Sequence, residues 1–434
     1  MPANPLDPIL TAIDERLSRA QACFWIGAIA LAARVLFVFL DSKGAGEIFG
    51  DAAQYHAYAV NLLGNGRYED FLGDRLFRMP GYPLFLAGVY FLFGLSVSAV
   101  QAVQCLLSAL ACAALYDAAR RLYGPRWGLA AGLVSAVYFG FLDSCPRLCS
   151  ESLSTSLVCF ILWLAFCAGS RAPAAASALM ALLLSALCFV RPDFAVFAVI
   201  LFLGLPRLTQ GRYGRRHTLL WIPIALALAL PWTLRNYRAF GRFVPGATQG
   251  EAGLYMGLAL PLEKLGDIPA AKGTPPKMPE LEQKAFYLRE FRVLRAQTPA
   301  WKILRAYLFN ILSVFYPFLP AYDWTYMLLL PFWLWGALLW KGRPEVRLPT
   351  LCALSYLSLH VFMGGPVSRY REPISGPLIL LAAAGAGSLH RRWGKAFWRW
   401  SAAYAMLNVL VWALAPKVRL LVVYGRASLF GGSF

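Results

Sequence analysis

The sequence is dominated by long runs of apolar residues, and these runs limit what the chain can fold into. Hydrophobic residues make up 59% of the 434 residues, and charged residues only 15%. A run of about 20 apolar residues can cross a bilayer as a helix, and the first such run covers residues 20–40. We therefore expect an all-α polytopic membrane protein, whose first run stays as an anchor because it is longer than the apolar part of a removable signal.

The basic residues report topology rather than a nucleic acid partner. The formal net charge is +19, but no basic helix is interleaved with stacking aromatic residues, as nucleic acid binding would require. Lys and Arg instead sit in short clusters between apolar runs, which is typical of cytoplasmic loops. The motifs of nucleotide-dependent enzymes, namely Asp-x-Asp, a Walker loop, a dinucleotide fingerprint and His-Glu-x-x-His, are absent from the sequence.

The nine cysteines form neither a disulfide framework nor a zinc spacing, because their number is odd and most lie inside apolar segments. Cys145 and Cys149 flank Pro146. They could pair in an oxidising compartment, but two free thiols are the favoured interpretation.

Counting helices against the basic clusters gives the topology. The apolar stretch 83–95 has about thirteen residues, too few to span, so we expect it to lie flat in the interface. The N-terminus is then cytoplasmic, the C-terminus is external, and about eleven spans (roughly ten to thirteen) cross the membrane. The expected spans are residues 20–40, 98–118, 127–142, 151–169, 174–190, 193–206, 218–235, 321–340, 348–364, 373–389 and 397–415.

The long polar segments fall on the external side in this topology. Residues 41–96 form the first external loop and residues 143–150 the second. A longer external stretch, 236–320, contains an amphipathic pattern at 280–297 that predicts a surface helix. Residues 301–320 are aromatic and nearly long enough to span, but their basic residues favour an interfacial element. These boundaries divide the chain into three parts, residues 1–235, 236–320 and 321–434.

Acids and arginines gather on this external side. Asp51 lies in the first loop and Glu151 at the end of the second. A sugar that leaves a lipid phosphate needs cations to stabilise the leaving group and a carboxylate to accept the proton of the incoming hydroxyl. Guanidiniums can hold such a phosphate by bidentate hydrogen bonds. One-step attack through an oxocarbenium-like transition state would invert the anomeric centre.

Structural alternatives exist for each of these residues. Asp51 could be a helix cap or a loop acid, and Glu151 an acid that the helix dipole favours near a helix N-terminus. An arginine beside a membrane often extends to the interface without any further role. That explanation fits less well for the pair Arg369 and Arg371, which lies on the side where Arg is normally scarce.

The order of these motifs resembles that of GT-C glycosyltransferases, specifically the family-39-like group that includes protein O-mannosyltransferases and the lipid A aminoarabinose transferase. The first external loop carries the string that most resembles bacterial members, and later landmarks follow in the same order. The matching residues are Asp51, Tyr55, Ala59, Gly66, Arg78, Pro80, Gly81, Tyr82 and Pro83, then Ser150 and Glu151, Arg191 and Pro192, Pro231, Trp232, Arg235 and Asn236, and Arg369, Tyr370, Arg371 and Pro373.

The resemblance implies a GT-C fold of type A, with seven conserved N-terminal spans and two juxtamembrane helices in the first external loop. It also implies that Asp51 is the general base and that Glu151 positions the acceptor or a divalent ion. No cofactor is certain, and a divalent metal ion stays an option, since the second loop has one Glu where several relatives have Asp or paired acids. The implied phosphate contacts are Arg78, Arg235, Arg369 and Arg371, and the other substrate-binding candidates are Tyr55, Tyr82 and Arg191.

The expected function is an integral membrane inverting glycosyltransferase at the extracytoplasmic face of the cell (inner) membrane. It would move a sugar from a polyprenyl phosphate, such as undecaprenyl phosphate, to a hydroxyl of a lipid, an envelope glycan or a protein. The alternative is a transporter or flippase of lipid-linked sugars, which would use the same basic rim without chemistry. Such proteins tend to have inverted halves and broken midplane helices, whereas here the polar motifs gather at one face.

Overall fold

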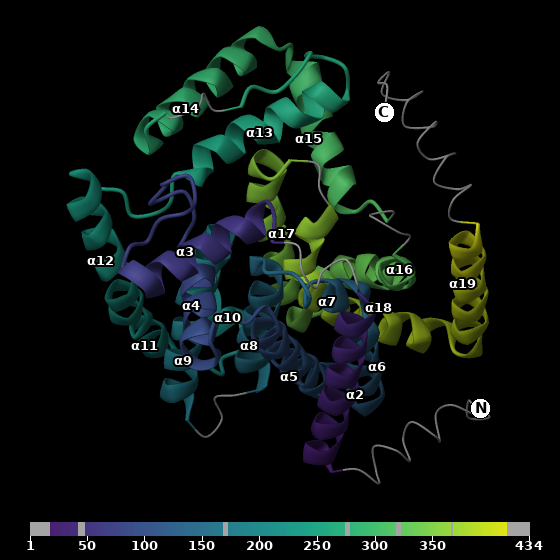
Figure 1. Cartoon of the computed structure of the whole chain (residues 1–434). Coiled ribbons are helices and arrows are strands. Elements are labelled where there is room, and N and C mark those ends of the chain that lie inside the picture. The colour runs from purple at the N-terminus through teal and green to yellow at the C-terminus, as the bar shows by residue number, and fades with distance from the viewer. Residues whose placement is uncertain are drawn as a thin grey trace.

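The computed structural model describes residues 18–41, 48–167, 172–273, 278–317, 323–365 and 368–414. Regular structure in these ranges is helical throughout. Most helices form a bundle, and α13, α14 and α15 form a cap at one end of it (Figure 1). The chain is a multi-pass membrane protein, as its apolar runs predict.

Seven helical segments of the described chain are long and apolar enough to cross a membrane. All seven overlap an expected span. They are α2 (Arg19–Leu40), α5 (Val97–Tyr123), α8 (Ser150–Cys167), α9 (Pro173–Val190), α11 and α12 (Arg215–Leu219 and Trp221–Phe240), η3 and α17 (Pro344–Val346 and Arg347–Met363), and η4 and α18 (Ser368–Ile374 and Ser375–Trp393).

The other four expected spans are also helical but are not among these seven, so the total of about eleven stays a prediction. The apolar stretch expected to lie flat in the interface forms α4 (Gly81–Phe93), again too short to span. The four shorter or more polar segments are α6 and α7 (Pro125–Val137 and Phe139–Asp143), η1 and α10 (Pro192–Phe194 and Ala195–Leu208), α16 and η2 (Trp324–Leu338 and Leu339–Lys341), and α19 (Lys395–Ala413).

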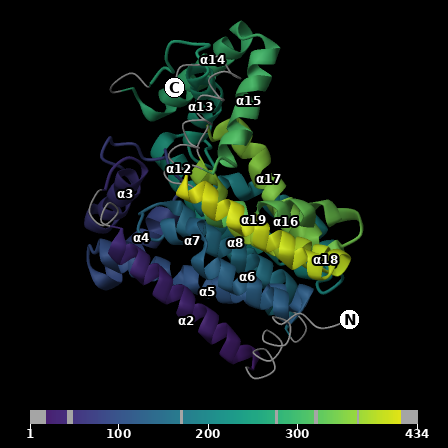
Figure 2. The same ribbon diagram turned by 90° about the vertical axis from the view of Figure 1, so that its right-hand side faces the viewer.

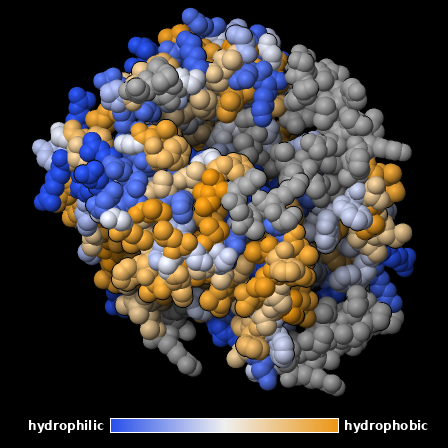
Figure 3. Space-filling model, viewed as in Figure 1, coloured by the Kyte–Doolittle hydropathy of each residue, from blue (hydrophilic) through white to orange (hydrophobic). Residues whose placement is uncertain are grey.

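One hydrophobic core runs through the bundle, from Ala22 on α2 to Ala383 on α18. The N-terminal and C-terminal helices therefore pack as one body, and α5, α6 and α8 all contact α18. On the outside, only 17% of the residues in the most apolar stretch of α2 are buried. Large side chains such as Phe24 and Phe39 of this helix are exposed. Figure 3 shows such orange residues across the middle of the molecule and blue ones toward the cap, as expected for a belt in contact with lipid.

The expected helix 127–142 is broken at Tyr138, which has an extended backbone between α6 and α7. A buried arginine, Arg34 of α2, lies at the break. It donates to the carbonyls of Ser135 and Ala136 at 3.3 and 3.1 Å. The last carbonyls of a helix have no partner within it, so Arg34 satisfies the end of α6 and lets the chain turn through α7 toward the second external loop.

The cap consists of α13 (Gln249–Lys264), α14 (Glu280–Gln297) and α15 (Ala300–Val314). The surface helix expected at 280–297 is α14, with the same bounds. The interfacial element expected at 301–320 is α15 up to Val314, and residues 318–320 lie outside the described residues. The sequence did not predict α13, because its apolar residues show no clear period of their own.

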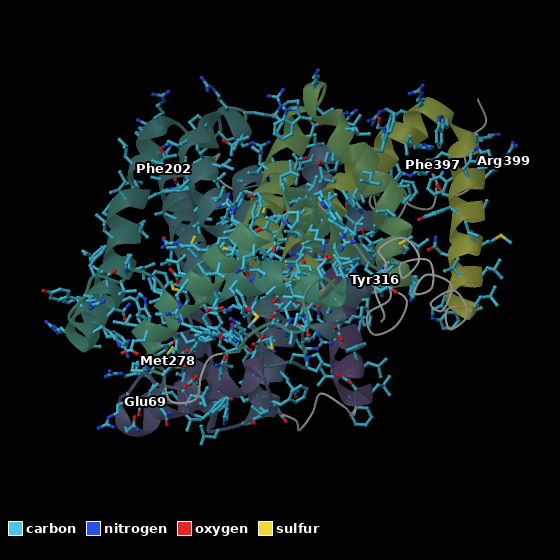
Figure 4. All side chains as sticks on the ribbon, turned by 90° about the horizontal axis from the view of Figure 1, so that it is seen from above. Glu69, Phe202, Met278, Tyr316, Phe397 and Arg399 are labelled. Carbon is cyan, nitrogen blue, oxygen red and sulfur yellow. The ribbon has the colours of Figure 1, made fainter. Side chains whose placement is uncertain are left out.

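Residues 48–96 of the expected first external loop contain α3 (Asp51–Asn65) and α4. Glu280 of the cap binds the segment that connects these two helices. The Glu280 carboxylate accepts hydrogen bonds from the backbone N–H groups of Arg75 and Leu76 at 2.8 and 2.7 Å. It also accepts from the Thr248 hydroxyl at 3.0 Å. Seen from above, Glu69 of this loop and Met278, just before α14, lie at the same edge of the molecule (Figure 4).

We predict that Glu280→Ala will loosen the segment between α3 and α4. Hydrogen bonds to a charged group contribute about 1.5–3 kcal/mol each, and the variant removes the carboxylate that accepts three. Hydrogen–deuterium exchange should show faster exchange of the Arg75 and Leu76 amides. The matched control is Glu282→Ala on the same helix, since Glu282 is exposed. Equal exchange in both variants would contradict the prediction.

Candidate active site

A cavity of about 420 Å³ opens where the first external loop, the bundle and the cap meet. Its walls come from α3, the segment before α4, the start of α8, the end of α9, the start of α13, the end of α17 and η4. Six of the nine candidate residues line it: Asp51, Tyr55, Arg78, Glu151, Arg191 and Arg369.

Both candidate catalytic acids begin helices. Asp51 is the first residue of α3, and Glu151 is in the first turn of α8. The positive end of a helix dipole favours a carboxylate at this position. The dipole effect suggested as a structural alternative therefore operates at both sites, and both acids face the same cavity.

Asp51 binds two arginines at once. One carboxylate oxygen accepts from Nη2 of Arg78 at 2.5 Å, and the other accepts from Arg369. Burial on its own would raise the pKa of Asp51, but the charges and hydrogen bonds of the two guanidiniums outweigh it. The net result is a pKa below the usual 3.8, so the carboxylate is ionised at neutral pH.

Glu151 continues this array of charges. Its Oε1 lies 3.3 Å from Nη1 of Arg191 and 3.8 Å from Nε of Arg369. Arg369 thus stands between Asp51 and Glu151. The Glu151 side chain is only 8% exposed, against 32% for Asp51, so Asp51 is the acid that a substrate can reach more easily.

Neighbouring polar and aromatic groups orient Arg78. Gln54 accepts from its Nε at 3.0 Å and from its Nη2 at 2.7 Å, and the guanidinium lies over the ring of Tyr55 at 5.2 Å. Tyr82, which the sequence placed among the substrate-binding candidates, is buried behind Tyr55 and does not line the cavity. Its hydroxyl donates to Gln104 at 2.8 Å, so its role here is to support Tyr55.

Two expected phosphate contacts, Arg235 and Arg371, also lie outside the cavity lining. Arg235 donates to the backbone carbonyls of Arg75 and Tyr68 at 2.7 and 2.9 Å. Arg371 donates to Asp323 at 2.6 Å and stacks on a buried ring. Both side chains hold the scaffold together, so neither is carried into the mechanism below.

The cavity also contains residues that the sequence did not single out, above all Asp193 and His360. Asp193 accepts from Nη2 of Arg191 at 3.2 Å. A sequence signal existed for Asp193, because it follows the Arg191–Pro192 motif directly. His360 lies in the last turn of α17 and gave no such signal, since a lone histidine on an apolar helix is more often structural.

The cavity's acids are paired with arginines rather than arranged around a metal. Among the described residues, no group of three or more His, Cys, Asp and Glu side chains is placed to hold a metal ion. Both oxygens of Asp51 accept from guanidiniums, and Glu151 lies against Arg191 and Arg369. These arginines already compensate the acids and would repel a further cation, so the observed arrangement does not fit a metal and no step below is derived through one. Cys145 and Cys149 are both free and buried.

The Arg78–Pro80–Gly81 motif has a packing reason. A Cβ on Gly81 would lie 2.5 Å from the backbone carbon of Phe189 and the nitrogen of Val190. Glycine is thus needed for α4 to begin directly against the end of α9. Arg78, three residues before Gly81, and Arg191, the residue after Val190, both line the cavity on either side of this contact.

A family model described as dolichyl-phosphate-mannose-protein mannosyltransferase matches residues 78–234. This segment runs from Arg78 through Glu151 and Arg191 to α12, and so carries much of the cavity. No curated protein matches the sequence significantly.

Solved structures of an archaeal oligosaccharyltransferase share the fold. An oligosaccharyltransferase of Archaeoglobus fulgidus tethered to an acceptor peptide superimposes with a TM-score of 0.53 and 13% identity, over 92% of this chain and 54% of that one. The oligosaccharyltransferase AglB of the same archaeon, in complex with an inhibitory peptide and a dolichol-phosphate, superimposes with a TM-score of 0.51 and 12% identity, over 92% of this chain and 54% of that one. ArnT of Cupriavidus metallidurans bound to undecaprenyl phosphate matches with a TM-score of 0.39 and 13% identity, over 83% of this chain and 77% of that one.

The chain thus has the fold of these oligosaccharyltransferase structures, and residues 78–234 match the mannosyltransferase family model. Both findings agree with the resemblance to GT-C glycosyltransferases that the sequence motifs predict. The chain spans about half the length of the oligosaccharyltransferase it matches.

We predict that Gly81→Ala will destabilise the folded protein, because the new methyl group would overlap the backbone of α9. Overpacking of this kind typically costs about 1–3 kcal/mol. Gly88→Ala on the same helix is the matched control, since nothing lies within 4 Å of its Cβ position, and alanine favours a helix by about 0.5–1 kcal/mol. Apparent melting temperatures in detergent should fall for Gly81→Ala and hold or rise for Gly88→Ala; the reverse order would refute the close contact.

Proposed function

We propose that this protein is an inverting glycosyltransferase that moves a sugar from a polyprenyl-phosphate donor to a hydroxyl acceptor. The observation that carries the proposal is the shared cavity, in which Asp51 and Glu151 lie around Arg369. The pairing of acids with arginines supplies both things the reaction needs, a proton acceptor and a cationic partner for the leaving phosphate.

Donor binding would activate the base. A phosphate, like a carboxylate, is a bidentate partner for guanidinium groups, so the donor can compete with Asp51 for its two partners, Arg78 and Arg369. When the phosphate takes these donors, Asp51 loses the two contacts that depress its pKa. The freed carboxylate becomes more basic and can turn to accept the proton of the acceptor hydroxyl.

Glu151 acts as a positioning residue in this mechanism. It is buried between Arg191 and Arg369, at 3.3 and 3.8 Å. Its charge keeps Arg369 in the cavity when the phosphate draws that guanidinium away from Asp51. The leaving polyprenyl phosphate gains charge as the glycosidic bond breaks, and the arginines already in place stabilise that charge without reorganisation.

The sequence supports the orientation and the chain's partners. The clusters of Lys and Arg favour a cytoplasmic N-terminus and a cavity on the extracytoplasmic side of the cell (inner) membrane. Residues 1–235 form the conserved module in this proposal, residues 236–320 an external part, and residues 321–434 the C-terminal helices. The similar oligosaccharyltransferase structures contain a dolichol-phosphate and peptides, which supports a lipid-phosphate donor and a lipid, glycan or protein acceptor here.

The transporter alternative has less support. A transporter needs no general base, whereas the most accessible acid of this cavity, Asp51, lies beside the two arginines that could hold a leaving phosphate. The transporter function would also leave the similarity to GT-C glycosyltransferases unexplained. Product formation distinguishes the two functions directly.

We predict that Asp51→Asn will lower kcat by about 10² to 10⁴, the usual contribution of a general base. The assay uses purified protein, polyprenyl-phosphate sugars and membrane or protein acceptors, with products detected by mass spectrometry. Glu69→Gln in the same external loop is the control, since Glu69 does not line the cavity. Unchanged transfer by folded Asp51→Asn would remove the base assignment, and lack of transfer by the wild type from every donor would favour the transporter.

We predict that the arginines beside Asp51 determine how kcat/KM depends on pH. Asp51 acts as a base only when ionised, and its depressed pKa means that kcat/KM, which reports the free enzyme, falls on the acid side only below about 3.8. Arg369→Gln removes one lowering charge, so the acid limb should move to higher pH. Measuring kcat/KM from about pH 7 downward tests this; identical acid limbs in wild type and Arg369→Gln would show that Asp51 is not the titrating group.

A further inference from the structure

The cavity has a second polar end, of which the mechanism above uses only Arg191, as a partner of Glu151. It lies beyond Glu151, where α9 ends and η1 begins, and is closed by the last turn of α17 and by η4. We call it the Asp193 subsite. Its members are Arg191, Asp193, His360 and Tyr370.

Asp193 is the accessible group of this subsite. Its Oδ2 accepts from Nη2 of Arg191 at 3.2 Å and lies 3.7 Å from Nδ1 of His360. The Asp193 side chain is 28% exposed, whereas those of Arg191 and His360 are 9% and 4% exposed. Both contacts use the same oxygen, so among the residues that the structure describes no donor bonds the other, Oδ1, which is available as an acceptor.

The imidazole behind Asp193 is held by its surroundings. It stacks on Tyr356, with ring centroids 5.4 Å apart, and lies against Tyr370 at 3.8 Å. A Cβ at position 364 would lie 1.7 Å from its Nε2, so only glycine at that position permits this placement of the ring. The side chain that orients Asp193 thus depends on Gly364.

The wall formed by the start of the cap consists mostly of small residues. Gly246, Ala247, Gly250 and Gly253 line it together with one larger residue, Gln249, and these small residues leave room in the volume of about 420 Å³ that Asp193 also lines. Pockets of this size hold small ligands that a few convergent polar groups orient. A carboxylate oxygen with free lone pairs accepts hydrogen bonds from hydroxyl groups.

We propose that the Asp193 subsite binds the sugar of the donor, and that Asp193 selects it by accepting hydrogen bonds from its hydroxyls. This inference rests on the proposed function. With the phosphate at Arg78 and Arg369, the attached sugar fills the remainder of the cavity, and its hydroxyls meet Oδ1 of Asp193. A site built to bond a hydroxyl rejects an analogue that lacks it, because the acceptor is then left unpaired.

Binding to the protein in detergent tests the inference, with short-chain polyprenyl phosphate as one probe. The other probes are its mannosyl, glucosyl and galactosyl derivatives and their monodeoxy analogues. We expect the wild type to bind one glycosylated lipid more tightly than the other glycosylated lipids, which carry the same charge on the phosphate. Asp193→Asn should lose roughly ten- to hundred-fold of that preference and bind the bare phosphate unchanged. Removing the bonded hydroxyl should weaken wild-type binding but not that of Asp193→Asn, as a double-mutant cycle requires.

Two further variants separate this role from a structural one. Gly364→Ala pushes the imidazole aside without altering a polar group, and it should lower the same preference. Asp267→Asn is the matched control, because Asp267 also pairs with two cations, Lys302 and Arg305, but lies outside the cavity. It should leave all the affinities as they are.

The outcomes distinguish the inference from the function on which it rests. Equal preferences in wild type and Asp193→Asn, or a wild type that binds all the glycosylated lipids equally, overturn the Asp193 subsite alone. A wild type that binds none of the lipid phosphates overturns the proposed function, and the subsite falls with it.

Discussion

The site depends on one constraint, namely that charges beside a bilayer are stable only when other charges compensate them. The cavity satisfies this constraint because its acids and arginines alternate, and we call this set of residues the array. Asp51 lies between Arg78 and Arg369, Glu151 between Arg369 and Arg191, and Asp193 beside Arg191. Removing Asp51 or Glu151 leaves a neighbouring arginine uncompensated, so these two acids and Arg369, which contacts both, should be strongly coupled. The surrounding helices, glycines and cap serve to keep this array in register.

The scaffold brings the array together through contacts that a short motif cannot display. Gly81 allows α4 to start against the end of α9, and Glu280 fixes the segment before α4 to the cap. Arg34 satisfies the end of α6 so that the chain can turn toward Glu151. Each contact joins segments far apart in sequence, and each places one wall of the cavity.

The sequence predicted the helical bundle and most of the cavity but not the direction of every side chain. Apolar run length places helices, and helix parity placed Asp51 and Glu151 on one side. The pair Arg369 and Arg371 shows the limit. Both lie in η4, a 3₁₀ helix, where side chains two residues apart point about 120° apart around the axis. Arg369 therefore faces the cavity, whereas Arg371 faces Asp323. His360 could not have been found, since its role arises from contacts with η1 and η4.

The depressed pKa of Asp51 is at first sight unsuited to a general base, because a base held by two guanidiniums binds protons weakly. It becomes an advantage if the same guanidiniums are the phosphate site. Before a donor binds, the two guanidiniums compensate the charge of the ionised Asp51 carboxylate, so the site is stable beside lipid. Only a ligand with a competing anion can release it, so the base gains strength when the leaving group is in place. A neutral sugar, or water alone, has no anion with which to draw the arginines away, and this coupling would restrict the chemistry to donors that carry a lipid phosphate.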